Sequence, residues 1–292
     1  MSSSRGEEPP SPPAPPPPFP DPARVPDQLA SLHGLLDKVV TAGMLCRHAR
    51  HHELVGRAAA QAEALYTEDS LVVASLRVTA VHGLWNMSCV ASEAGSAAEE
   101  ADLDRRAWSL LLPLHALLLR RVAANTLLSG TVRQEESEYG AYLESAIRRA
   151  ANKPALSNEH LQAAGQWLGY KVLLEVVNKT VNLLESRSWP RAQEASAASF
   201  VLDALDVIPR TAGILGKIGH EVVLTNTVET TGLHSCDPAF RDAFLRKWRS
   251  PAVSNMLRAR GTLQTGVTVA ENEQNMAEFE ARRRADIEKI GL

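Results

Sequence analysis

The chain has 292 residues, of which 45% are hydrophobic, so it is long enough to bury the core of one large domain or two small ones. Its 31 basic and 34 acidic residues give a formal net charge of −3, without the basic excess typical of non-specific nucleic-acid binding. Cys46, Cys89 and Cys236 lie far apart and form no CxxC pair. The sequence therefore predicts neither a disulfide framework nor a thiolate zinc site, and it favours a reducing compartment.

The N-terminus lacks the apolar segment of a signal peptide, and the longest apolar stretches, such as residues 110–119, are shorter than a membrane span. We therefore expect an intracellular protein, in the cytoplasm or the nucleus, with no signal peptide and no transmembrane segment.

Prolines crowd residues 9–26, which read PPSPPAPPPPFPDPARVP. Such a run cannot form a helix or the interior of a sheet and favours extended polyproline II. We expect residues 1–26 to be a disordered proline-rich tail. Its Pro-x-x-Pro spacing could dock a polyproline-reading domain, but a solvated spacer is the favoured interpretation.

From Asp27 onward, apolar residues recur at three- and four-residue spacing, which is typical of amphipathic helices. Thr67–Ser70 has the residues of a capping turn, Ser92–Asp102 is polar enough to predict a loop, and Pro113 should kink its helix. The predicted helices cover 27–44, 47–66, 71 through Trp85, 104 onward, 131–151, 157–186, 190–207, 237–248, 251–260 and 271–289.

Short turns between successive helices predict antiparallel neighbours. We expect an all-α fold in which helical hairpins of residues 27–292 pack as a bundle or as a short tetratricopeptide-like stack, with a possible subdivision near 152–157 and an exposed terminal helix at 271–292. Within the less regular segment 209–236, Val222–Val228 could form a strand. A lone strand has no partner in so helical a chain, so an irregular helix is favoured.

His48 and His52 are the candidate metal ligands, because residues four apart share one face of a helix. A site would need a third ligand, and position 56 is Gly where the HExxH motif has its second histidine. The neighbouring arginines oppose a cation electrostatically. A solvated polar helix face is the favoured alternative, and no cofactor motif is found.

Gly213–Gly219 resembles a phosphate loop but has GxxGxxG spacing and no Gly-Lys-Ser/Thr ending. No nucleophile elbow occurs, and the remaining histidines are scattered along the chain. An enzyme would therefore need a site assembled from dispersed side chains, with two of them converging in a deep pocket.

Residues 241–260 form the basic patch of the sequence, with Phe240, Phe244 and Trp248 among the cations. Basic residues beside aromatics can bind RNA or another anion. The favoured alternative is that Phe244 and Trp248 attach their helix to the core while the cations reach outward and pair with acids of a neighbouring helix. The candidate anion-binding residues are Arg246, Lys247, Arg249, Arg258 and Arg260.

Four segments, residues 69–78, 105–121, 245–253 and 282–292, resemble the helical region of a protist (dinoflagellate-type) protein family. In many of its members that region continues into a MYND-type zinc finger. The cysteine and histidine series of such a finger does not occur in these 292 residues, so no zinc ligand is carried over. The resemblance implies a helical platform that binds a partner.

The sequence thus favours a non-enzymatic α-helical scaffold or protein–protein interaction module, whose partner is another protein and not a nucleic acid or a membrane. The alternatives are an enzyme with an unrecognised site and an RNA- or anion-binding protein that uses the 241–260 patch. The first hypothesis predicts an apolar surface with a polar rim.

Overall fold

A computed structural model describes residues 25–127, 132–186, 190–207 and 233–248. These residues form α-helices joined by turns and contain no strand, so the predicted all-α class is confirmed. The helices are α1 Val25–Met44, α2 His48–Leu65, α3 Leu71–Glu93, α4 Ala97–Ala123, α5 Gln134–Ala150, α6 Asn158–Gln166, α7 Leu168–Glu185, α8 Arg191–Val207 and α10 Pro238–Trp248. None of them is both long enough and apolar enough to span a lipid bilayer.

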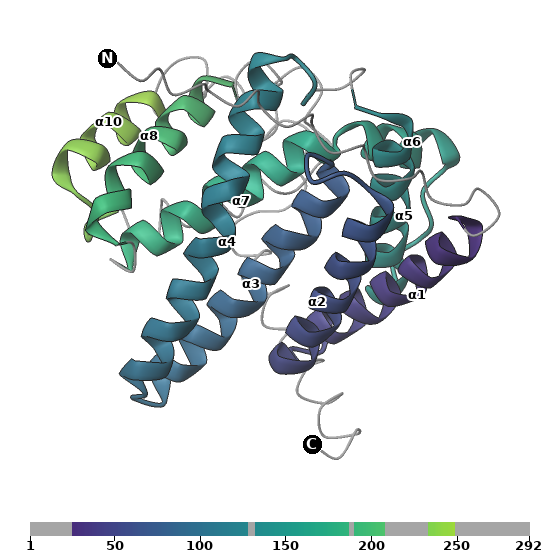
Figure 1. Cartoon of the computed structure of the whole chain (residues 1–292), viewed down its shortest axis with the longest axis horizontal. Helices are drawn as coiled ribbons and strands as arrows, with labels where there is room; N and C mark the ends of the chain where they lie inside the picture. The colour runs from purple at the N-terminus through teal and green to yellow at the C-terminus, as the bar shows by residue number, and fades with distance from the viewer. Residues whose placement is uncertain (1–24, 128–131, 187–189, 208–232, 249–292) are drawn as a thin grey trace, which may run out of the picture.

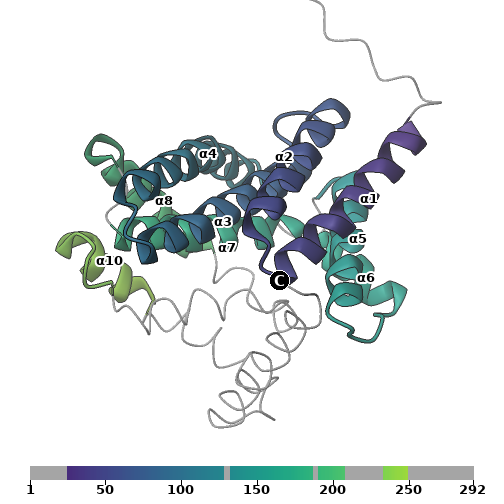
Figure 2. The same ribbon diagram turned by 90° about the horizontal axis from the view of Figure 1, so that it is seen from below.

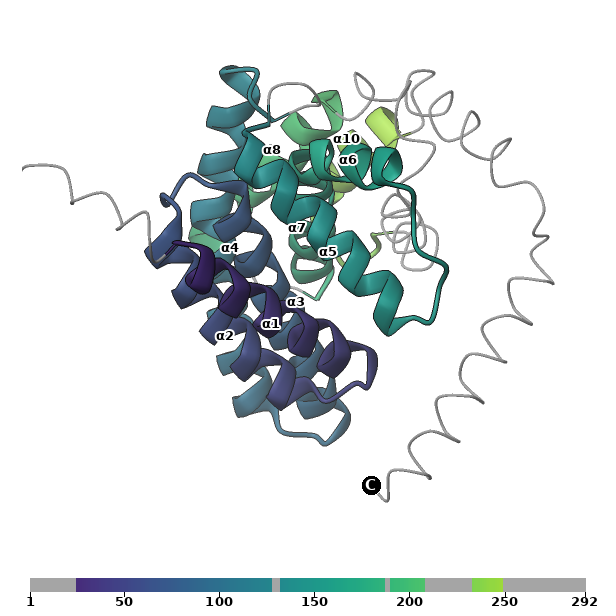
Figure 3. The ribbon, with the colours of Figure 1, turned by 90° about the vertical axis from the view of Figure 1, so that its right-hand side faces the viewer.

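Helices α1 to α4 lie side by side in chain order and form one layer (Figures 1 and 3). Helix α7 crosses behind α3 and α4 and contacts both. Seen from below, α1, α5 and α6 gather at one end of the molecule and α8 and α10 at the other, with α3 and α7 between them (Figure 2). The predicted packing of antiparallel hairpins is therefore present in the first layer, and a second group of helices covers one of its faces.

Most residues of α3 and α7 are buried, and on α7 these include the polar residues Asn178, Lys179 and Thr180. Buried side chains from both sides of the 151–157 connection belong to one continuous hydrophobic cluster, which extends from Leu32 on α1 to Trp248 on α10. The subdivision predicted near 152–157 is untested, but the core is shared across it.

The sequence predicted one helix over 157–186, and this is wrong in detail, because the chain breaks at Trp167 into α6 and α7. Two close backbone contacts flank the break. A Cβ atom on Gly165 would lie 2.0 Å from the carbonyl oxygen of Ser137, and one on Gly169 would lie 2.1 Å from that of Leu127. These contacts between segments override the helical periodicity of the local sequence.

The loop predicted at Ser92–Asp102 is also wrong, since α3 ends at Glu93 and α4 begins at Ala97. The turn is made by Gly95, whose φ of 72° is in the left-handed region that glycine adopts easily. Glu99 and Glu100 lie in the first turn of α4, where negative charge stabilises a helix N-terminus. The acidic residues that suggested a loop are therefore the start of a helix, which then continues through Pro113.

A buried ion pair joins three helix ends. Arg121, near the end of α4, donates from Nη1 and Nη2 to the two carboxylate oxygens of Glu136 at 3.0 and 2.9 Å. The same guanidinium also donates to the carbonyl oxygens of Thr126 and Asp69. Glu136 in turn accepts from the backbone N–H of Leu71 and of Arg133. The pair therefore links the start of α3, the end of α4 and the start of α5.

Several features discussed from the sequence lie outside the described residues: residues 1–24 of the predicted tail, Gly213–Gly219, the strand-like Val222–Val228, the helix at 251–260 and the terminal helix at 271–292. The last two residues of the predicted 1–26 tail, Val25 and Pro26, instead begin α1.

Candidate functional site: a pocket between four helices

The two candidate metal ligands lie on α2, and His52 is engaged by a cation. Its Nε2 lies 3.2 Å from Nη2 of Arg106 on α4. A guanidinium can only donate, so the imidazole accepts with the lone pair that a metal would need. Burial and then the charge of Arg106 lower the pKa of His52. Within the described part of the chain, no three His, Cys, Asp or Glu side chains are placed to hold a metal ion.

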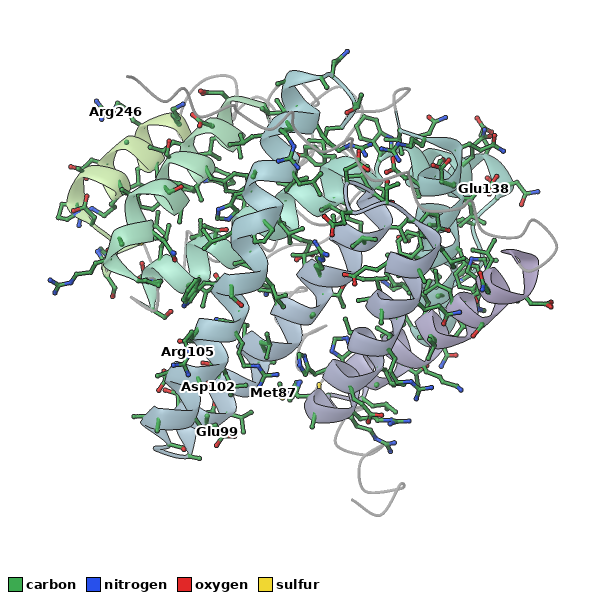
Figure 4. All side chains as sticks on the ribbon, in the orientation of Figure 1. Met87, Glu99, Asp102, Arg105, Glu138 and Arg246 are labelled. Atoms are coloured by element: carbon green, nitrogen blue, oxygen red, sulfur yellow. The ribbon has the colours of Figure 1, made fainter. Side chains whose placement is uncertain are left out.

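The described part of the basic patch is α10, and its aromatic residues face the core. Phe244 and Trp248 are buried and stacked, with ring centroids 5.8 Å apart, as the favoured interpretation expected. Nζ of Lys247 lies 2.5 Å from Oδ2 of Asp206 on α8, so this charge is paired locally. Arg246 points outward at the edge of the molecule (Figure 4). The other three candidates, Arg249, Arg258 and Arg260, lie outside the described residues.

A pocket of about 280 Å³ lies between α1, α3, α5 and α7, and His51 of α2 also reaches it. We call it the central pocket. Its lining residues are Leu36, Val39, Val40, Gly43, Met44, His51, Ser75, Leu76, Val78, Thr79, His82, Tyr139, Leu143, Ile147, Lys171, Val172 and Glu175.

The central pocket has two unlike walls. Helices α1 and α5 contribute mainly aliphatic side chains, including Val40, Leu143 and Ile147. Helix α3 contributes Ser75, Thr79 and His82 at the spacing of one helix face, and α7 contributes Lys171 and Glu175 one turn apart. A molecule in the pocket would meet hydrocarbon on one side and hydrogen-bonding groups on the other.

Lys171 is the unusual group of the polar wall. Its side chain is 17% exposed, and its nearest carboxylate oxygen, Oε2 of Glu144, is 4.0 Å away. It makes no hydrogen bond to any residue that the structure describes. Burial lowers the pKa of the amine, while Glu144 and Glu175 oppose this shift. The pocket therefore contains a largely buried amine to which no described residue offers a hydrogen-bond acceptor.

The imidazoles of the pocket are held neutral at pH 7. The side chain of His82 is solvent-exposed, but desolvation by nearby protein atoms and then the charge of Lys179 lower its pKa to about 4. The ring of His51 lies between α1 and α3, where Cβ atoms on Gly43 and Gly83 would approach it to 3.2 and 3.3 Å. Burial is also the main cause that lowers the pKa of His51.

The pocket offers binding chemistry in the form of aliphatic walls and unused amine donors. The enzyme alternative predicted two titratable side chains that converge in a deep pocket. No hydrogen bond between described residues joins Lys171, His51 and His82 to one another.

Sequence reasoning did not select Lys171 or Glu175. The available signal was the spacing of Lys171, Glu175 and Lys179 at four-residue intervals in a helix that is otherwise rich in valine and leucine. Charged residues at this spacing form one stripe on an apolar helix, and such a stripe needs a partner when the helix is buried.

No protein-family model, no curated protein and no solved structure matches this chain. The resemblance to the protist family therefore stays a prediction, and the function has to be argued from the pocket.

Proposed function

We propose that the chain is a helical interaction module that binds another protein at the central pocket. The observation that carries this proposal is the pocket itself, a hollow with aliphatic walls from α1 and α5 and a polar wall from α3 and α7. Concave sites with apolar walls and a few converging polar groups are where proteins most often bind their ligands.

The interaction hypothesis predicted an apolar surface patch, and no flat patch of this kind occurs among the described residues, so the pocket is the apolar surface that remains for a partner. Among the described residues, the large hydrophobic side chains that are exposed are Met44 and Val90. They lie on different helices, and Met44 lines the central pocket. A partner must therefore bring an apolar side chain to the pocket if it is to bury hydrocarbon. Such an anchor residue contributes roughly 1.5–3 kcal/mol when fully buried, so polar contacts at the same site are needed for useful affinity.

The charges of α10 give the anion-binding alternative less support than the pocket gives to protein binding. Lys247 is paired with Asp206, and Nε of Arg241 lies 3.3 Å from Oδ1 of the adjacent Asp242. Arg241 and Lys247 are therefore paired with carboxylates, which weaken their attraction for phosphate groups, whereas Arg246 is exposed.

The test is to fill the pocket and ask whether a partner is lost. Leu143 is half-buried on the aliphatic wall, and Leu143→Trp places a bulky ring in the hollow. The matched control is Val90→Trp, which adds the same ring at an exposed position of α3 outside the pocket. The full chain and both variants are used to capture proteins from lysate, after circular dichroism has shown that all three are equally helical.

We expect at least one captured protein to bind the full chain and Val90→Trp equally and to be lost with Leu143→Trp. Capture should survive nuclease treatment and the change Arg246→Ala. The proposal is wrong if every specific interaction is insensitive to Leu143→Trp, and nuclease-sensitive capture would instead favour nucleic-acid binding.

A further inference from the structure

The unused amine of the central pocket indicates what kind of segment the partner presents. Building on the proposed function, we infer that the pocket binds the C-terminal end of a partner chain, with its last, aliphatic side chain against α1 and α5 and its free carboxylate on Lys171. Capture of a terminal carboxylate is one of the recurring ways in which proteins recognise peptides.

The size of the pocket fits a chain end better than a helix. Its volume of about 280 Å³ lies at the lower limit of small-ligand pockets, which span roughly 300–1,000 Å³. An α-helix with its side chains is about 10–12 Å across and needs a long groove. One terminal residue with its carboxylate occupies a volume that the pocket offers.

Among the described residues, Lys171 shares its nearest carboxylate with another cation. Glu144 lies 3.4 Å from Nε of Arg148 and 4.0 Å from Nζ of Lys171. On α7, Glu175 lies one helical turn from Lys171 and one helical turn from Lys179. Glu175 also interacts with another group. The carboxylate nearest to Lys171 is thus shared with a second cation, Arg148. A carboxylate of the ligand would supply a hydrogen-bond acceptor that no described residue gives to the amine.

Of the remaining polar groups, Glu175 lines the pocket and repels a carboxylate, whereas His82 can donate to one. The side chain of His82 is solvent-exposed; desolvation by nearby protein atoms and then the charge of Lys179 lower its pKa to about 4, and the neutral imidazole keeps one N–H to donate. Thr79 lies one turn before His82 on the same wall of the pocket. Its hydroxyl donates to the carbonyl oxygen of Ser75 at 2.7 Å, which fixes its orientation. The polar wall therefore presents donors from Lys171 and His82 to an incoming carboxylate.

The aliphatic wall sets the preference for the last side chain. Val39, Val40, Leu143 and Ile147 provide hydrocarbon without an aromatic ring or a charge. Leucine, isoleucine, valine or methionine should therefore be favoured at the terminal position, and aspartate or lysine should be rejected, because a second charge would be buried without a partner.

The experiment uses the full chain and a library of random short peptides made in two forms, one with free carboxylate ends and one with amidated ends. Selected peptides should come from the first form only and should end in an aliphatic residue. Amidating a selected peptide should weaken its binding roughly tenfold or more, because a charge-assisted hydrogen bond is lost. The change Lys171→Met should weaken the free-acid peptide to the same extent and remove the difference between acid and amide.

The matched control is Lys38→Met, since Lys38 is an exposed lysine of α1 that does not line the pocket. This variant should bind the selected peptides as the unchanged chain does. Circular dichroism and the unfolding midpoint establish that both variants are folded.

Three outcomes would overturn the inference. Equal binding of acid and amide peptides, or acid binding that survives Lys171→Met, would show that the carboxylate is not recognised there. If the carboxylate is not recognised but Leu143→Trp still abolishes partner capture, the inference is wrong and the proposed function is still supported. If octanoate or N-acetyl-leucine binds as tightly as the best peptide, the ligand is a small carboxylic acid and not a chain end.

Discussion

Arg121 and Lys171 are two mostly buried cations that differ in the hydrogen bonds they make. The side chain of Arg121 is 6% exposed and donates to both carboxylate oxygens of Glu136 and to two backbone carbonyls. Lys171 is 17% exposed and makes no hydrogen bond to a described residue. Both lie on helices that are rich in leucine, so the local sequence alone does not distinguish them.

The difference separates a structural role from a binding role. A buried charge costs free energy unless hydrogen bonds and an opposite charge replace the water that it loses. The Arg121–Glu136 pair has both, and it fixes how α3, α4 and α5 meet. Lys171 has a distant carboxylate and an open pocket in front of it, so a ligand can still supply what is missing. Removing each charge should therefore have different consequences.

The largest effect is expected at the ion pair. Glu136→Gln leaves the guanidinium of Arg121 buried without its counter-charge and weakens the acceptor of the Leu71 N–H. Breaking a buried pair on one side typically lowers the free energy of unfolding by about 3–5 kcal/mol. Denaturant unfolding of the variant and the unchanged chain measures this loss.

The control is Glu138→Gln, two residues further along α5. Glu138 is exposed and accepts a hydrogen bond from Gln134, and its side chain points outward (Figure 4). Its replacement should change the free energy of unfolding by about 0.5 kcal/mol or less. If the two variants are equally stable, the junction is not the structural element that its hydrogen bonds suggest.

The next largest effect is expected from acid, through a buried imidazole whose pKa is lowered by burial. Nε2 of His115 on α4 lies 2.9 Å from Oγ1 of Thr180, and the ring is stacked on Phe200. Burial lowers the pKa of His115 to about 3, against 6.5 in an unfolded chain. The unfolded state therefore binds a proton at a higher pH than the folded state, so stability is complete above pH 6.5 and falls as the pH drops toward 3.

Between pH 7 and pH 5 this one group should remove about 2 kcal/mol from the free energy of unfolding. In the variant His115→Gln the titrating group is absent, so the loss over the same interval should be smaller by about that amount. Denaturant unfolding at the two pH values measures both losses. A loss of the same size in the variant would show that other groups, such as His51 and His82, cause the acid sensitivity.

The sequence predicted those parts of the fold that depend on local periodicity. The ends of α1, α2, α8 and α10 fall within two residues of the predicted bounds, and the capping residue Ser70 accepts from the N–H of Val72 at the start of α3. The inward orientation of Phe244 and Trp248 was also correct, since residues four apart share one helix face.

The features that the sequence did not predict depend on contacts between segments. Nothing local shows that Gly165 and Gly169 will touch the carbonyls of Ser137 and Leu127 and so break one helix into two. The central pocket was missed for the same reason, because it exists only where α1, α3, α5 and α7 meet. The spacing of Lys171 and Glu175 placed both on one face of α7, but only the arrangement of the helices shows that this face is at a pocket.

The smallest effect is expected at Lys171, and it tests the comparison most directly. Lys171→Met keeps a side chain of similar length and removes a desolvated amine that has no hydrogen bond to a described residue. Replacing a buried charge of this kind by a hydrophobic residue is often neutral or stabilising, so we expect no change or a gain of about 1 kcal/mol in the free energy of unfolding. Arg121→Met, in contrast, leaves Glu136 buried without its partner and should cost about 3–5 kcal/mol. If both changes to Met destabilise the chain equally, Lys171 is a structural cation and has no unused donors to offer a carboxylate. If Lys171→Met is stable, the amine is retained at some cost to the folded chain, as expected of a residue that serves binding.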